Sequence, residues 1–305
     1  MDRSVRISSF SVPSPLVAAS SGGFFASEDI DVAIEKATGS TGQFEALLAG
    51  DLDLIHTAAD NVMKHVQAGG TDVCVVATLQ LGLAMHLVVG PDITAWEDLR
   101  GRVVGVDAAD SGYAVVLYDL LARHGLPPGS YDVLPGGDTE TRAASLVEGT
   151  VSACMLAHQP LREVLDRGAH VLVHGHEAYP WYPGLTIATT RRLIGEQPDL
   201  VGRYVRAMMR ACWWAVGPDE AAEVIGLIAT ARGLDVASAS EILDLERASA
   251  TVDIPDPDEL AASLLRCAQL RSAMGGPRPE GYADLTFYRA AHAELFGHLD
   301  ATEDA

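Results

Sequence analysis

Short β-branched stretches alternate with helical stretches through the first 190 residues of the chain. In the clearest cases a strand ends in a loop of small residues that leads directly into a helix, around Arg6–Ser21, Asp31–Leu48, Arg102–Leu121 and Tyr131–Val147. Strands and helices that alternate at these lengths predict a mostly parallel sheet flanked by helices. Because a pair of these units occurs twice, we predict an α/β protein with two lobes that face each other across a cleft.

In the last third of the chain only helical periodicity is present, and Gly- and Pro-rich joints separate the predicted helices. The β-branched run Gly184–Thr190 is interpreted as a crossing that returns the chain to the first lobe. We therefore predict that lobe one comprises residues 1–86 and 186–305, with a helical C-terminal segment. Lobe two is predicted to comprise residues 87–185, and the ligand cleft to lie between the lobes.

The charge balance limits the partners. The chain carries 42 acidic and 21 basic residues, a formal net charge of −21. Nucleic acids and anionic membrane surfaces attract basic proteins, so this balance argues against both. It does not exclude a small anionic ligand, because helix N-termini act locally while distant surface charge is screened. No apolar run approaches the roughly 18 residues that a membrane span needs, so we predict no membrane span.

The N-terminus carries no recognisable leader. Residues 1–4 run directly into the predicted strand Val5–Ser8, without a basic segment, an apolar segment, a cleavage site or a lipid-anchoring cysteine. The sequence as written therefore predicts a cytoplasmic protein. A leader removed from the chain would instead make it a periplasmic protein or an extracellular lipoprotein.

Four cysteines lie far apart inside apolar stretches: Cys74, Cys154, Cys212 and Cys267. No CxxC pair or Cys/His pair exists, so we predict buried, reduced thiols rather than zinc ligands. The segment His174-Gly175-His176-Glu177 has no third or fourth ligand nearby in the sequence, so we predict a surface loop and no metal site. No phosphate loop, dinucleotide fingerprint or nucleophile elbow is present, and we predict no cofactor.

The order of elements resembles the type II fold of periplasmic binding proteins, in the family of aliphatic-sulfonate, taurine and nitrate binders and thiamine-pyrimidine proteins. The stretches Phe24–Asp60, Asp98–Val106 and Pro183–Val216 carry the resemblance. It implies a protein that closes on a small organic molecule, with hinges near Leu83–Val89 and Gly184–Ala188. If the chain is exported, the resemblance also implies the permease of an ABC transporter as a partner.

The opening segment Ser8–Asp31 is similar to an intracellular branch of that family, which includes an aromatic sulfinate desulfinase. That enzyme presents a nucleophilic cysteine in its first loop, where this chain has Phe10 with Ser11 beside it. No cysteine lies near, and the cysteine cluster of the pyrimidine synthases is absent. The alternative to a binding protein is therefore an intracellular lyase or hydrolase, a decarboxylase or desulfinase-like enzyme without a cysteine nucleophile.

Ligand-binding residues are expected where strands end and helices begin, because helix N-termini present unpaired backbone N–H groups. Small polar residues occupy these junctions in both lobes: Ser40, Thr41, Gly42, Thr57, Asp60, Ser111, Gly112 and Thr139. Any one of them is more commonly a helix cap than a ligand contact. Their occurrence at every such junction, on the same edge of both predicted sheets, is what favours a binding site.

Aromatic and imidazole side chains complete the predicted site. Phe10, Tyr113 and Trp181 are expected to supply stacking surface, which favours aromatic anions or heteroaromatic ligands. His56 and His158 each end a predicted strand, one in each lobe, so both are expected to face the cleft. There they either hydrogen-bond to backbone or ligand or, in the enzyme alternative, act as acid and base.

Overall fold

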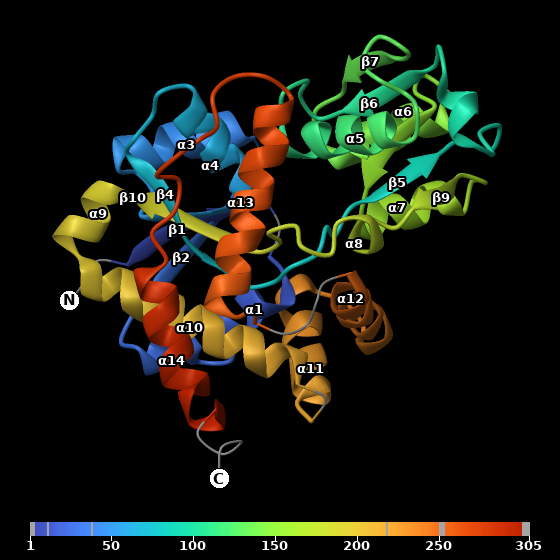
Figure 1. Cartoon of the computed structure of the whole chain (residues 1–305). Helices are drawn as coiled ribbons and strands as arrows, with labels where there is room; N and C mark the ends of the chain where they lie inside the picture. The colour runs from blue at the N-terminus through green and yellow to red at the C-terminus, as the bar shows by residue number, and fades with distance from the viewer. Residues whose placement is uncertain (1–3, 11, 38, 218, 250–253, 301–305) are drawn as a thin grey trace.

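The computed structural model describes residues 4–10, 12–37, 39–217, 219–249 and 254–300, which form two lobes joined by two crossing segments (Figure 1). Each lobe is built on one five-stranded sheet with helices packed around it. The predicted two-lobed α/β architecture is confirmed. Within the described residues no helix is both long and apolar enough to cross a membrane.

The sheet of the first lobe has the strand order β2-β1-β3-β10-β4. Its strands are β1 (Val5–Ser9), β2 (Val32–Lys36), β3 (Leu54–Thr57), β4 (Val73–Thr78) and β10 (Thr186–Thr190). β1 pairs in parallel with β2 and β3, whereas β10 is antiparallel to β3 and β4. All strands except β10 therefore run in one direction, which confirms the predicted, mostly parallel sheet.

The sheet of the second lobe repeats this arrangement in the order β7-β6-β8-β5-β9. Its strands are β5 (His86–Val89), β6 (Val103–Val106), β7 (Asp132–Pro135), β8 (Ala153–Leu156) and β9 (His170–Val173). β6 is parallel to β7 and β8, and β5 is antiparallel to β8 and β9. In each lobe the single reversed strand adjoins a crossing segment.

Helices follow the strands in both lobes. In the first lobe they are α1 (Ser14–Ser21), α2 (Phe24–Ser27), α3 (Ser40–Ala49), α4 (Ala59–Gln67), α9 (Arg191–Glu196), α10 (Pro198–Val216), α11 (Ala221–Arg232), α12 (Val236–Ser249), α13 (Pro257–Ala273) and α14 (Thr286–Asp300). In the second lobe they are the 3₁₀ turn Trp96–Leu99, α5 (Gly112–Arg123), α6 (Thr139–Val147) and α7 (His158–Leu165), and α8 (Gly175–Ala178) lies on the second crossing.

The long helix α10 anchors the core of the first lobe. Apolar residues recur along one side of it, so Tyr204, Met208 and Cys212 are completely buried. The helix packs against α1 and α14. All four cysteines of the chain are buried and free of disulfides, as predicted.

Two chain segments, residues 79–85 and 174–185, cross between the lobes and are hydrogen-bonded to each other. Leu79 N–H donates to Leu185 O at 2.9 Å, and Gly82 N–H donates to Tyr182 O at 2.8 Å. Gly184 N–H donates to the first crossing in return. The two segments that connect the lobes therefore form one short hydrogen-bonded ribbon and are not independent of each other.

The sequence pattern does not predict three short helices, α2, α8 and α9. A helix of one or two turns is too short to show hydrophobic periodicity. In α8 the difference corrects the prediction of a surface loop at residues 174–177, because the segment forms a helical turn with Gly175 buried.

Candidate functional site

The carboxyl ends of the strands in the two lobes face each other. Hydrogen bonds with Thr141 lower the pKa of the Asp138 carboxyl at the start of α6, and the charges of Arg142 and then of Lys36 lower it further. Lys36 ends β2 in the other lobe. Elsewhere between the lobes, a Cβ on Gly112 of α5 would lie 2.9 Å from the Cβ of Asp60 in α4. The candidate site lies between the lobes, from Lys36 and Asp138 at one end to Asp60 and Gly112 at the other.

Gln43 organises the wall formed by the first lobe. Its side-chain amide donates to Ser8 O at 3.2 Å, to Ser8 Oγ at 2.9 Å and to His56 O at 3.1 Å, so it joins the ends of β1 and β3. The Oε1 atom of Gln43 is buried and accepts no hydrogen bond among the described residues. Ser14 Oγ, at the start of α1, is in the same state. Unpaired buried polar atoms are costly and mark places where a ligand or water completes the site.

The start of α5 forms part of the opposite wall. Ser111 caps the helix, because its Oγ accepts from Ala114 N–H at 3.1 Å and donates to Asp107. The cap leaves the first backbone N–H groups of α5 without partners inside the helix. Ser111 and Gly112 are both buried, and Gly112 packs directly against Asp60. Here the lobes are in contact rather than separated.

Arg142 is a buried cation in the second lobe, only 4% exposed. Its guanidinium donates to Gly137 O, to Met155 O at 3.3 Å and to Thr139 Oγ1 at 3.4 Å. No described carboxylate lies within ion-pair distance of it, although a buried charge ordinarily has a charged partner. The described hydrogen bonds of Arg142 at the N-terminus of α6 therefore all go to neutral oxygens, although its charge also lowers the pKa of Asp138.

An ion-pair network ties α13 to both lobes. Arg271 of α13 donates to Asp60 Oδ2 at 2.6 Å, and both groups are almost completely buried. The same guanidinium donates to the backbone oxygen of Asp110 in the second lobe at 3.1 and 3.2 Å. Lys64 of α4 reaches the Asp110 carboxylate at 2.7 Å. Figure 1 shows α13 running beside the first lobe with one end next to α4 and α5.

Aromatic rings from the second crossing lie behind this network. The ring of Tyr182 is 6.5 Å from that of Tyr113, the second residue of α5, and 6.3 Å from that of Trp181. The hydroxyl of Tyr182 is buried and has no hydrogen-bond partner among the described residues. Trp181 and Tyr113, both predicted site residues, are thus linked through Tyr182, which directly follows Trp181 in the sequence.

Burial shifts two predicted site residues toward their neutral forms. His56 is enclosed beside α10, where its Nε2 lies 2.9 Å from the Tyr204 hydroxyl, and burial lowers its pKa to about 4. Burial raises the pKa of Asp60 to about 6, although Arg271 and Lys64 act in the opposite direction. His56 is therefore neutral at pH 7 and packs against the core of its own lobe, and an acid–base role for it stays a prediction.

The other predicted residues of the first lobe differ in how far the structure describes them. Phe10 is 42% exposed in the loop after β1. Ser11 lies outside the described residues. In the second lobe, His158 is the first residue of α7, but its side chain is outside the described part of the structure.

The predicted polar residues at helix starts are placed as expected. Ser40, Thr41 and Gly42 form the first turn of α3, and Thr139 is the first residue of α6. Their backbone N–H groups belong to the helix ends that have no partners inside the helix. Thr57 is buried at the end of β3. Whether these residues contact a ligand stays a prediction.

Three residues of the candidate site were not predicted from the sequence: Gln43, Arg142 and Arg271. Gln43 is the fourth residue of α3 and Arg142 is the fourth residue of α6. A search for polar residues within the first turn of each helix could therefore have found them. Arg271 is 211 residues away from Asp60 in a helix without an evident motif. No local pattern in the sequence signals that contact.

Two hollows in the described surface lie away from the interlobe contact. One of about 380 Å³ is lined by residues that include Gly50, Thr190 and Glu196, at the end of the first sheet opposite to the candidate site. Another of about 330 Å³ lies between α13 and residues 278–285. Neither contains a predicted site residue. We assign the candidate site from its polar groups, because the lobes are in contact where it lies.

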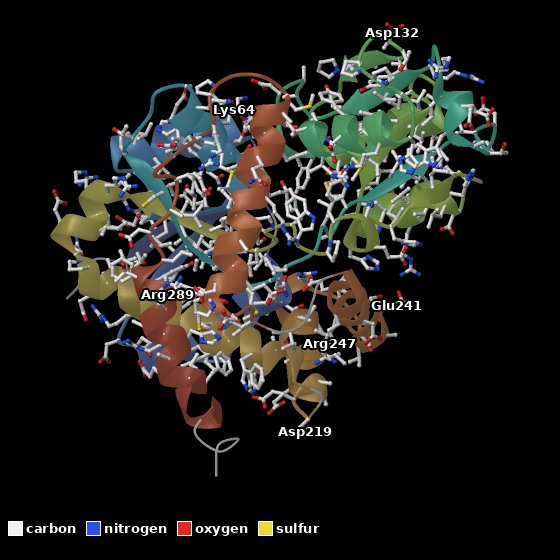
Figure 2. All side chains as sticks on the ribbon, viewed as in Figure 1. Lys64, Asp132, Asp219, Glu241, Arg247 and Arg289 are labelled. Atoms are coloured by element: carbon white, nitrogen blue, oxygen red, sulfur yellow. The ribbon has the colours of Figure 1, made fainter. Side chains whose placement is uncertain are left out.

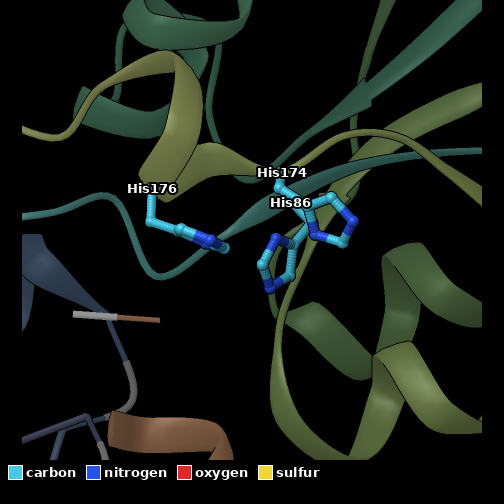
Figure 3. A group of neighbouring side chains, drawn as sticks. All are labelled: His86, His174 and His176. Carbon is cyan, nitrogen blue, oxygen red and sulfur yellow. The ribbon is translucent and has the colours of Figure 1, made fainter. Parts of the chain in front are cut away.

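No third metal ligand lies near His174 and His176 in the sequence, and the absence of a metal site there stays a prediction. The structure places His86 beside them, with one donor atom of each imidazole within 4.8 Å of the others (Figure 3). His86 is 88 residues away in sequence from His174, so a search for ligands at short spacing cannot find it. Figure 2 shows all described side chains around the two lobes.

A model of the family described as NMT1/THI5 like matches residues 12–221, which is most of the chain. The chain belongs to the NMT1/THI5-like family. This confirms the resemblance stated from the sequence. A comparison with curated proteins finds no match.

Solved structures of several other proteins share the fold. The alkanesulfonate-binding protein SsuA from Xanthomonas axonopodis pv. citri, bound to MOPS, has a TM-score of 0.71 at 20% identity, covering 95% of this chain and 98% of that one. The periplasmic aliphatic sulphonate-binding protein SsuA from Escherichia coli has a TM-score of 0.70 at 19% identity, covering 92% and 91%. The desulfurization enzyme DszB in complex with biphenyl-2-sulfinic acid, as a cysteine-to-serine variant, has a TM-score of 0.67 at 19% identity, covering 95% and 99%. At these identities the likeness shows the periplasmic-binding-protein fold.

Proposed function

We propose that this NMT1/THI5-like protein captures a small organic anion between its lobes and releases it when they open at the crossings. Lobe one would comprise residues 1–86 and 186–305, and lobe two residues 87–185. The observation that carries the proposal is Arg142, a buried guanidinium whose described hydrogen bonds all go to neutral oxygens and which forms no ion pair with a described carboxylate. An anion from solution would supply the missing charge partner.

The remaining groups favour an anion attached to an aromatic or heteroaromatic body. The first turns of α3, α5 and α6 offer unpaired N–H groups, which bind sulfonate, sulfinate or carboxylate oxygens. Tyr113, Trp181 and Phe10 offer ring surface for the organic part. The similar structures named for sulfonates and for biphenyl-2-sulfinic acid are consistent with this ligand class.

The further partner depends on where the protein works. In the periplasm or as an extracellular lipoprotein, the ligand would be delivered to the permease of an ABC transporter. In the cytoplasm, the chain would act as a carrier or sensor of the same ligand class. In either location the acidic surface argues against nucleic acid as a partner.

The second candidate function is a lyase or hydrolase on the same scaffold, and the pKa of Asp60 is the observation that favours it. A carboxyl group with a pKa of about 6 can exchange a proton near neutral pH. A thiolate mechanism has no support, because burial raises the pKa of Cys74, Cys154, Cys212 and Cys267. Such an enzyme would have to work by proton transfer, with helix N-termini stabilising the developing anion.

The ligand class is tested by titrating the purified protein with benzenesulfonate, benzenesulfinate, benzoate and the neutral benzamide in a calorimeter. We expect at least one of the three anions to bind at one per chain and benzamide not to bind. Arg142→Gln should weaken binding of that anion by about 10- to 100-fold, because a hydrogen bond to a charged group is lost.

The matched control is Arg167→Gln, which removes the same charge from an exposed position in the same lobe. It should leave the affinity unchanged. Arg142→Lys, which keeps the charge, should bind more tightly than Arg142→Gln, and circular dichroism checks that each variant is folded. Equal affinities of the Arg142→Gln variant and the parent protein would overturn the proposal.

Mass spectrometry of the free and bound compounds separates the two candidate functions. A binding protein returns its ligand unchanged and retains at most one molecule per chain. A product that accumulates beyond one molecule per chain would contradict capture and release, and would establish the enzyme instead.

A further inference from the structure

Three imidazoles meet where the second lobe joins the crossings. His86 is the first residue of β5, His174 directly follows β9, and His176 is in α8. The ring of His86 lies 5.1 Å from that of His174 and 5.9 Å from that of His176, and the latter two rings are 5.7 Å apart. Figure 3 shows the three side chains converging on one space from two different chain segments.

Gly175 explains why two histidines of one segment can reach the third. A Cβ at this position would lie 1.8 Å from Met85 O and 2.8 Å from Leu83 O, so only glycine allows so close an approach of the backbones. The Gly175 N–H donates to His86 Nδ1 at 3.3 Å. The close approach places His174 and His176, on either side of the glycine, at the start of β5.

His176 supplies a second, independent indication of a ligand. Its Nδ1 atom is buried and has no hydrogen-bond partner among the described residues. An imidazole nitrogen removed from water without a partner is unfavourable, and a metal ion is one group that satisfies it.

We infer that His86, His174 and His176 form a site for one divalent transition-metal ion, of which Zn²⁺ is the representative. Imidazole nitrogen favours Zn²⁺, Co²⁺, Ni²⁺ and Cu²⁺, whereas Mg²⁺ and Ca²⁺ require oxygen ligands. Three protein ligands leave a fourth tetrahedral position for water or an exogenous ligand. This site is separate from the anion site proposed between the lobes and does not depend on it.

The geometry requires only a small adjustment. Zn–N bonds of about 2.0–2.1 Å place tetrahedral donor atoms roughly 3.4 Å apart, compared with the 4.8 Å within which the three atoms lie here. Side-chain rotations that bring each ring inward by less than about 1 Å therefore complete the site. If the ion binds Nδ1 of His86, it replaces the long contact from Gly175 N–H, which is weak at 3.3 Å.

An ion at this place would link the two crossings where they meet the second lobe. It would bind His86, which begins β5 after the first crossing, and His174, which begins the second crossing. Residues 79–85 lead into His86, and residues 174–185 begin with His174. The two segments are already hydrogen-bonded to each other, so the metal would add a rigid link at the end of the ribbon nearest the second lobe.

The test is calorimetric titration of tag-free, metal-depleted protein with ZnCl₂. We expect one Zn²⁺ per chain, and an affinity reduced by about 100-fold or more in His176→Ala and in His174→Ala, since even loss of an outer-shell partner costs 10- to 100-fold. The matched control is His170→Ala, which removes a half-buried imidazole from β9 of the same lobe. It should bind Zn²⁺ like the parent protein.

The Co²⁺ absorption spectrum of the unaltered protein tests the site without any substitution. Tetrahedral coordination by nitrogen gives intense visible bands, whereas adventitious octahedral binding at the surface gives weak ones. Weak bands, the absence of Zn²⁺ binding to the parent protein, or parent-like affinity in His176→Ala would each overturn the inference. An equal loss of affinity in His170→Ala would do the same.

Discussion

His56 and Asp60 are buried four residues apart, and in each the enclosure favours the uncharged form. The pKa of His56 falls to about 4 and that of Asp60 rises to about 6. His56 is neutral at pH 7 at no cost, because imidazole is already mostly neutral there. Asp60 differs, because at pH 7 its carboxylate must be held charged in the interior by Arg271. The two residues thus make the free energy of unfolding depend on pH in opposite ways.

The contribution of His56 can be isolated with His56→Gln. In the unfolded chain imidazole is protonated below about pH 6.5, while the folded protein keeps His56 neutral down to about pH 4. The stability that His56 contributes is therefore complete above pH 6.5 and is lost as the pH falls toward 4, by about 3 kcal/mol.

Urea unfolding at pH 7.5, 6.0, 5.0 and 4.5 measures this effect. The difference in unfolding free energy between the parent protein and His56→Gln should shrink steadily as the pH falls. Asn61→Ala, which alters a neighbouring side chain that does not titrate, is the control and should show no such trend. A difference between parent and His56→Gln that stays constant over this range would contradict the burial of a neutral His56.

The sequence predicted single residues well only where the chemistry is local. Ser111 and Thr139 could be expected at helix starts because capping residues directly precede or begin a helix. Arg271 and His86 could not be found in this way, since each meets its partners across 88 residues or more. Such contacts follow from how the lobes and crossings are packed, which no short pattern in the sequence encodes.

Among the elements, α5 is a helix whose position depends on one small residue. Gly112 begins it and lies against Asp60 of α4 in the other lobe. A methyl group added there would lie 2.9 Å from the Asp60 Cβ, which is closer than atoms approach without movement. The contact between α4 and α5 therefore sets how closely the lobes can come together.

Gly112→Ala should push the lobes apart. Overpacking of this kind costs about 1–3 kcal/mol, so the affinity for the bound anion should fall by about 10-fold or more. Small-angle scattering should also give a larger radius of gyration. Gly226→Ala in α11 is the control, because a Cβ there meets nothing within 4 Å. It should leave the affinity and the scattering as in the parent protein, and equal affinity in Gly112→Ala would contradict this role for Gly112.

The sequence predicted the longer elements because hydrophobic periodicity becomes recognisable only over several residues. The unit predicted around Tyr131–Val147 contains β7 and α6, and the predicted run Gly184–Thr190 contains β10. α8 is missed altogether, because a single turn has no periodicity of its own.

At the scale of the whole molecule, α13 is the piece that bridges the two lobes. Its Arg271 forms a buried ion pair with Asp60 of the first lobe and donates to the backbone oxygen of Asp110 in the second lobe, a partly buried contact. The neighbouring pair of Lys64 and Asp110 joins the same two lobes, but its side chains are 40% and 64% exposed. Loss of the buried Arg271 side chain is therefore expected to cost more stability than loss of the exposed pair.

Arg271→Gln should reduce the free energy of unfolding by about 3–5 kcal/mol, because it leaves Asp60 buried without its partner. Lys64→Gln removes the exposed pair and should cost at most about 1 kcal/mol. Chemical denaturation of the two variants beside the parent protein measures both values. Equal destabilisation by the two substitutions would show that the Arg271 contact is not the dominant one.

The order of strands in the first sheet has a consequence for how the protein is made. The second sheet is complete once residue 173 has left the ribosome, because β5 to β9 are consecutive in the chain. The first sheet needs β10 between β3 and β4, and β10 is synthesised about a hundred residues after β4. Until then β3 and β4 have unpaired edges, which chaperones and other chains can bind. The lobe that begins the chain is therefore the last to fold, and the nascent protein should be most prone to aggregation while its second lobe is already native.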